Sequence, residues 1–296
     1  MASVFAVFQI FLNSLFLIGV LSLSTMGITL TFKTAGVANF AQGIVATVGA
    51  FTAAWLFMRA GLGPWVSGFG GIAVCFVIGW VVDALIVSRL KSGPIGRVMV
   101  TLGLILIVSA LIPMIFGMIP YTYPRYFAGI LEFRLFGNDF TVTQNGLFIF
   151  LTAMGVITIV FLALYQTKWG LSVRATASNP IVASIMGVNT KRLTAISWAI
   201  SSALAALAAV LLGSQTSNVN IGMLDAVGTN ALLALVIGGI TSFYGPIIGA
   251  IIIPTLLAML AMVSGLWSNV LMYSVVLFVI LVKPEGLFGK KTMNKI

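Results

Sequence analysis

Stretches without a single charged residue divide this chain into apolar segments. They cover 1–32, 34–58, 60–82, 98–124, 140–167, 193–224 and 226–282. A transmembrane helix needs ~20 apolar residues, so the first six suit one span each. The last is too long for one span, and a turn at 241–246 and a break at 264–265 divide it into about 226–241, 246–264 and 267–282. The pattern predicts nine spans, or eight if one, such as the short span 226–241, is a half-span or re-entrant helix.

Composition agrees with a membrane protein. Of 296 residues, 60% are hydrophobic and only 7% are charged, against roughly 25% charged in soluble domains. A soluble domain of this size would leave too much apolar surface in water. The sequence therefore predicts an all-α, polytopic transmembrane helix bundle with short or re-entrant helices, formed as a single domain over 1–296.

The basic residues predict how this bundle is oriented. They cluster in three places: Arg89, Lys91 and Arg97; Lys168, Arg174, Lys191 and Arg192; and Lys283, Lys290, Lys291 and Lys295. Because cytoplasmic loops carry the excess of Lys and Arg, 167–192 is predicted as a cytoplasmic loop, the C-terminus as cytoplasmic and the N-terminus as outside. The net charge of +10 is then explained by these loops, and no nucleic-acid partner is expected.

Segment 118–143 becomes an extracytoplasmic loop in this arrangement, with its two bases balanced by two acids. Alternating apolar and polar residues on either side of Gly137-Asn138-Asp139 predict a small hairpin there. Such a hairpin is either a docking surface or a simple connector.

The residues needed for enzymatic chemistry are missing from the pattern. The chain has no histidine, a single cysteine (Cys75) and five scattered acids, which excludes histidine-centred catalysis and a multi-cysteine metal site. The segment nearest to a nucleotide-binding loop, 286–292, has the wrong spacing. We expect no cofactor on this chain, and any ATP used must bind to a partner. Only Asp83 lies within a span, where it is expected to meet a basic partner or water, or to be functional.

A short helix is predicted in the basic loop. Asn179 is a favourable N-cap, Pro180 suits the first helical position, and Gly187 suits a left-handed stop. The helix between them would carry its apolar residues on one face: Ile181, Val182, Ile185 and Met186. Such a face either enters the groove of a cytoplasmic partner or lies on the lipid bilayer.

Polar residues at the start of two apolar segments predict a solute path. They are Asn39, Gln42, Gly43 and Thr47 after the break at Gly36, and Thr229 and Asn230 at the start of the short span. Polar side chains are costly in lipid unless they face a cavity or a partner, and half-helix starts offer free N–H groups. The alternative is that these side chains hydrogen-bond neighbouring helices and only hold the bundle together.

Four motifs, in order along the chain, resemble those of branched-chain amino acid ABC-transporter permeases, on the LivH-like side of that family. In the basic loop they are Gly170, Arg174, Ala175, Ala183, Gly187, Val188 and Asn189. The others are 39–43 with Gly49-Ala50, 236–240 with 245–250, and 283–289. Gln42 stands where the family often has histidine.

The resemblance implies a function for the whole chain. It implies a multi-pass, non-enzymatic permease subunit in the cell (inner) membrane, forming half of the path of an ATP-driven importer for branched-chain amino acids or a related small polar solute such as urea or an amide. Its partners would be a second homologous permease, identical or different, two cytoplasmic ATPase subunits and an extracytoplasmic solute-binding protein. A self-contained channel or facilitator is the alternative. The predicted ATPase-coupling residues are Gly170, Arg174, Ala175, Asn179, Pro180, Ala183, Ile185, Gly187 and Asn189.

Overall fold

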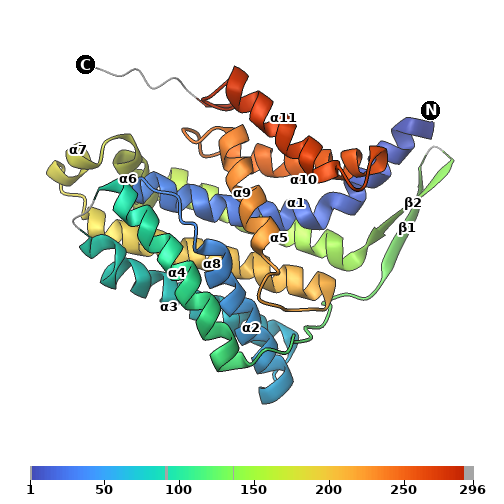
Figure 1. Ribbon diagram of the computed structural model, residues 1–296, viewed down its shortest axis with the longest axis horizontal. Helices are drawn as coiled ribbons and strands as arrows, with labels where there is room; N and C mark the ends of the chain where they lie inside the picture. Colours follow the sequence, from blue (N-terminus) through green and yellow to red (C-terminus); the bar gives the residue numbers. More distant parts are fainter. Residues whose placement is uncertain (1, 91–92, 136, 290–296) are drawn as a thin grey trace.

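The computed structural model describes residues 2–90, 93–135 and 137–289, which form a helical bundle with one β-hairpin (Figure 1). The transmembrane-like helices are α1 (Ala2–Ala35), α2 (Gln42–Ala60), α3 (Pro64–Leu85), α4 (Pro94–Phe116), α5 (Gln144–Gln166), α8 (Thr190–Thr216), α9 (Asp225–Gly238), α10 (Gly245–Val263) and α11 (Ser268–Val282). The shorter elements are η1 (Val87–Arg89), α6 (Lys168–Ser178), α7 (Pro180–Ile185), β1 (Ile130–Leu135) and β2 (Asn138–Thr143).

The predicted helix bundle is confirmed. Within the described ranges, seven helices are long and apolar enough to cross a membrane, and α9 and α11 are shorter apolar helices. The three-way division of the last apolar run is also correct, because α9, α10 and α11 occupy it. Whether the total is eight or nine crossings stays a prediction.

Helix α1 runs along the bundle and joins its two ends (Figure 1). With 34 residues it is about 51 Å long at 1.5 Å per residue. Near its start, the Phe8 ring stands edge-on to Phe140 of β2, and Gln9 donates a hydrogen bond to the Thr141 carbonyl. Near its end, the Lys33 ammonium donates to the carbonyl of Thr241, in the turn between α9 and α10.

Basic residues from three separate segments meet at this second end. The Arg97 guanidinium donates to the Ala35 carbonyl, and Lys33, Arg97 and Lys191 line one cavity there. The segment after α11 reaches the same end, because Leu287 N donates to Ile237 O. Basic residues gathered at one end are what the predicted orientation requires. Which side of the membrane this end faces stays a prediction. Of the predicted basic clusters, Lys91, Lys290, Lys291 and Lys295 lie outside the described residues.

The predicted hairpin is confirmed at the opposite end, where β1 and β2 pair antiparallel with Leu135 facing Asn138. Gly137 has φ +81°, a conformation that glycine adopts without steric cost. Arg134 and Asp139 form an exposed ion pair of 3.5 Å across the strands.

Two helices begin inside the bundle rather than at its ends. The predicted break at Gly36 is confirmed, because Gly36 has φ +71° just after the end of α1, and α2 begins at Gln42, beside Ser24. Likewise, α9 starts after the irregular segment 217–224, with Leu224 opposite Gly43. The two half-helix starts therefore face each other at the middle of the bundle.

Small residues let α2, α3 and α8 approach closely. A Cβ atom at Gly71 of α3 would overlap the carbonyl oxygen of Gly49 in α2, and one at Gly79 would overlap Ser202 in α8. Small side chains of α2 and α8 are buried as well: Ala46, Ala50, Ala54, Ala205, Ala206 and Ala209. Membrane helices gain packing energy by close approach of their backbones, so α2, α3 and α8 form a tightly packed group.

Candidate functional site

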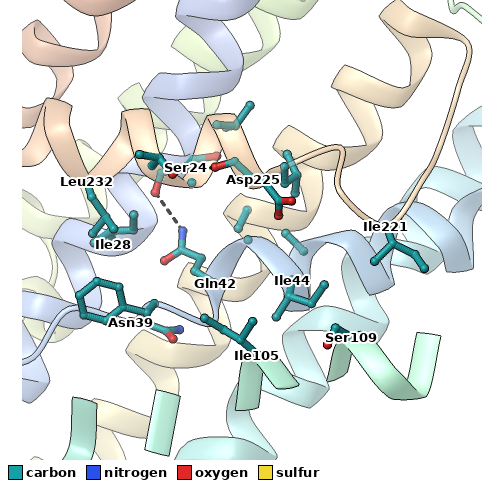
Figure 2. Close-up of a pocket in the computed structure, with 18 residues that line it drawn as sticks. Ser24, Ile28, Asn39, Gln42, Ile44, Ile105, Ser109, Ile221, Asp225 and Leu232 are labelled. Carbon is teal, nitrogen blue, oxygen red and sulfur yellow. Dashed lines mark hydrogen bonds between the residues drawn. The ribbon is translucent and has the colours of Figure 1, made fainter. Parts of the chain in front are cut away.

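A cavity of about 400 Å³ lies where the two half-helix starts meet, between α1, α2, α4, α8 and α9 (Figure 2). Its apolar wall includes Ile28, Ile44, Ile105, Ile221, Leu224 and Leu232. Its polar side chains are Ser24, Asn39, Gln42, Ser109, Asp225 and Thr229. A mostly apolar cavity with a few convergent polar groups is typical of a site for a small solute.

The structure brings four of the six predicted path residues together. Asn39, Gln42, Gly43 and Thr229 line this cavity. Thr47 is fully buried outside its lining, where its hydroxyl donates to the carbonyl of Gly43. Asn230 also lies outside the lining, and its side-chain oxygen is buried with no hydrogen-bond partner among the described residues.

Gln42 links three helices. Its amide nitrogen donates to the Ser24 carbonyl of α1 at 2.9 Å, and its amide oxygen accepts from the Ser201 hydroxyl of α8 at 3.0 Å. Ser201 is also within hydrogen-bond distance of Gly27 O, at 2.8 Å. Gln42 therefore lines the cavity and also holds the bundle together, so the two interpretations of this residue are not exclusive.

The side chain of Asn39, unlike that of Gln42, makes a hydrogen bond within its own segment. Its side-chain oxygen accepts from the Ala41 backbone nitrogen at 3.1 Å, which shapes the chain just before α2, and its side chain is buried against the cavity. This bond holds the turn before α2 in shape, and among the described residues it does not link Asn39 to another helix.

Asp225 is a cavity residue that the sequence pattern did not identify. It is the first residue of α9, it is exposed, and it is the single charged side chain in the described lining. One turn later, the Thr229 hydroxyl donates to the Asp225 carbonyl, so the two side chains start from the same first turn. The sequence does contain a signal for this residue, because Asp225 is an acid at the start of the short helix, in a segment without lysine or arginine.

A second cavity, of about 560 Å³, lies at the basic end of the bundle. Lys33, Arg97 and Lys191 line it together with Asp83, which is 1% exposed. Both carboxylate oxygens of Asp83 lack a hydrogen-bond partner among the described residues, and no described ion pair involves them. Asp83 thus lies among bases, as the sequence suggested, without a direct bond to any of them.

The barrier between the two cavities differs in length from helix to helix, and no described residue lines both. On α1 the first cavity ends at Ile28 and the second begins at Phe32, about 6 Å apart at 1.5 Å per residue, with fully buried residues between them. The corresponding gap is about 12 Å on α4, from Ile105 to Arg97, and about 17 Å on α8, from Ala205 to Thr194.

The predicted short helix of the basic loop is confirmed as α7. The Asn179 side-chain oxygen accepts from the backbone nitrogens of Ile181 at 3.0 Å and Val182 at 3.1 Å. Gly187 has φ +88°. The apolar face is open, because Ile181, Ile185 and Met186 are 71%, 78% and 79% exposed.

The rest of the loop fixes α7 in place. The segment before it forms a helix of its own, α6, which the sequence analysis did not predict. Gly170 in α6 leaves no room for a Cβ atom because the end of α5 lies against it, and the Arg174 guanidinium stacks over Tyr165 at 5.0 Å. Asn189 caps α8 by accepting from Arg192 N at 3.0 Å. Ala183, within α7, is buried.

Comparison with known proteins gives a consistent result. Residues 10–281 match the family described as the permease component of branched-chain amino acid transport systems. The chain is 29% identical to the probable branched-chain amino acid transport permease protein LivH of Methanocaldococcus jannaschii, over 91% of this chain and 88% of the relative. It is 26% identical to the high-affinity permease LivH of Escherichia coli K12, over 93% of each chain, and 26% identical to BraD of Pseudomonas aeruginosa over both full lengths.

A solved structure supports the fold. PsaBC from Streptococcus pneumoniae in complex with Fab has a chain that superposes with a TM-score of 0.50 at 12% identity, covering 92% of this chain and 91% of that one. At this identity the likeness concerns the arrangement of helices alone.

Proposed function

Since the chain belongs to the family of permease components of branched-chain amino acid transport systems, we propose that it forms half of the translocation path of an ATP-driven importer. The solute would be a branched-chain amino acid or a related small polar molecule. The relatives are permeases, and nothing in the comparisons favours a self-contained channel. A permease subunit is a transport protein, so no reaction is assigned to this chain.

The proposal assigns the remaining parts of the importer to partners. A second permease, identical or different, would complete the path, and two cytoplasmic ATPase subunits would bind and hydrolyse ATP, so this chain holds no cofactor. An extracytoplasmic binding protein would deliver the solute at the hairpin end. The assembly would lie in the cell (inner) membrane, with the basic end of the bundle and α7 on the cytoplasmic side.

The observation that carries this proposal is the exposed apolar face of α7. A capped helix of six residues presents Ile181, Ile185 and Met186 to solvent at the basic end of the bundle. Exposed apolar side chains on one face of a helix are a typical anchor for a groove in a partner protein. The opposite side of the helix carries Ala183, which is buried, so α7 turns one side to the protein and its apolar side to solvent.

The test is a charge placed on this face in the assembled complex. Ile185→Asp should abolish the stimulation of ATP hydrolysis by solute and stop import, while the permease is still inserted and purified with its membrane partner. Ile185→Leu conserves volume and polarity and serves as the matched control, with both activities retained. Normal ATPase stimulation and import by Ile185→Asp would contradict the assignment of α7 to the ATPase.

A further inference from the structure

We propose that Asp225 determines which solutes enter the central cavity, favouring those with an ammonium or other N–H donor group and repelling anions. This inference rests on the proposed function, because it takes the cavity to be part of the solute path. It concerns a residue whose carboxylate stands at the start of α9, at the middle of the bundle (Figure 2).

The cavity has an uneven distribution of charge. Asp225 is the single ionisable side chain in its described lining, and the bases Lys33, Arg97 and Lys191 all line the other cavity. The carboxylate is therefore not neutralised by a lysine or arginine of the same cavity. Its negative charge is stabilised by the start of α9, because the N-terminus of a helix carries a partial positive charge and unbonded N–H groups.

The other polar groups of the cavity have less capacity for a solute. Both ends of the Gln42 amide are already bonded to α1 and α8, and the Asn39 oxygen is bonded to Ala41 N. The exposed carboxylate of Asp225 is thus the strongest acceptor open to a ligand. Ile44, Ile221 and Leu224 of the same lining offer apolar surface. The chemistry that fits is a small solute with an N–H-donating group next to an apolar one.

The first experiment measures the electrostatic effect directly, without relying on transport. Ser109, which lines the cavity, is replaced by cysteine in a Cys75→Ser background, in the purified complex. Its modification rates by a cationic and an anionic methanethiosulfonate reagent are compared, each normalised to the rate with a small free thiol. One negative charge in the lining of the same cavity should favour the cation by about tenfold, and Asp225→Asn should bring the ratio close to one. Asp139→Asn removes an exposed carboxylate of the hairpin and should leave the ratio unchanged.

The second experiment measures import by the complex in vesicles. Asp225→Asn should lower the maximal rate of leucine import by about tenfold at an unchanged dependence on the loaded binding protein, and Asp225→Glu should restore most of it. If the maximal rate falls while the dependence on the binding protein is unchanged, Asp225 acts on passage through the cavity and not on docking of the binding protein.

The outcomes distinguish this inference from the proposed function. A rate ratio near one in the presence of Asp225, or one unaffected by Asp225→Asn, overturns the role of Asp225, as does a lack of reaction with either reagent. If the wild-type complex imports no amino acid while the ratio behaves as expected, the proposed function fails and the charge selectivity of the cavity stands.

Discussion

Replacing Gln42 by leucine should loosen the start of α2 from its two neighbours. The variant keeps the approximate volume of the side chain but removes the bonds to Ser24 O and Ser201 Oγ. Interhelical hydrogen bonds in membrane proteins are worth ~0.6 kcal/mol each on average. Ser201 keeps the Gly27 carbonyl as an acceptor, so only the two lost bonds count, and the free energy of unfolding should fall by about 1 kcal/mol. Reversible denaturation of the purified permease in mixed detergent micelles measures it.

Thr47→Val is the matched control in the same helix. Thr47 is also buried, but among the described residues its hydroxyl bonds only to Gly43 O within α2, so no hydrogen bond between helices is lost. We expect its unfolding free energy to change by less than about 0.5 kcal/mol. If Gln42→Leu is as stable as Thr47→Val, the bonds of Gln42 do not hold α2 to α1 and α8, and the reasoning is wrong.

Three further predictions concern the ends and the packing of the bundle. A cysteine at Asn138 in a Cys75→Ser background should react with an impermeant reagent from the extracytoplasmic side, and reaction only from the cytoplasmic side would overturn the orientation. Gly71→Ala should cost about 1–3 kcal/mol, because its Cβ would overlap Gly49 O, whereas Gly103→Ala, which faces open space, should not; equal stability of the two variants would refute this. Burial raises the pKa of Tyr126 above its usual value, and the hydrogen bond with Tyr123 adds to this. The resulting stability is complete below the unfolded pKa of about 10 and is lost as pH rises above it, so Tyr126→Phe should flatten the alkaline decline in thermal stability.

Features with local causes could be predicted from the sequence. The short helix α7 follows from Asn179, Pro180 and Gly187, each of which acts within a few residues of itself. The hairpin follows from alternation around a glycine turn, and the short α9 from the break before Gly245. Capping and turn preferences are properties of a few adjacent residues, so no knowledge of the tertiary structure is needed.

The candidate site could be predicted only in part. Polar residues at the start of an apolar segment placed Asn39 and Gln42 near a path, but the same pattern included Thr47, which lies outside the cavity lining. A pattern along the chain shows where polar side chains lie in a segment, and it does not show which neighbouring helix they meet. Asp225 was missed for the same reason, because its position depends on segment 217–224 bringing the start of α9 to the middle of the bundle beside Gly43.

The short barrier between the two cavities has a consequence for how the membrane voltage acts on this protein. When water fills both cavities, the potential falls mainly across this barrier, ~6 Å along α1 and ~17 Å along α8, rather than across the ~30 Å of hydrocarbon. A net charge crossing the barrier gains or loses nearly the whole ~2.3 kcal/mol per 100 mV. A zwitterion carries no net charge, so its passage requires no such electrical work, and its import rate should not depend on the membrane potential.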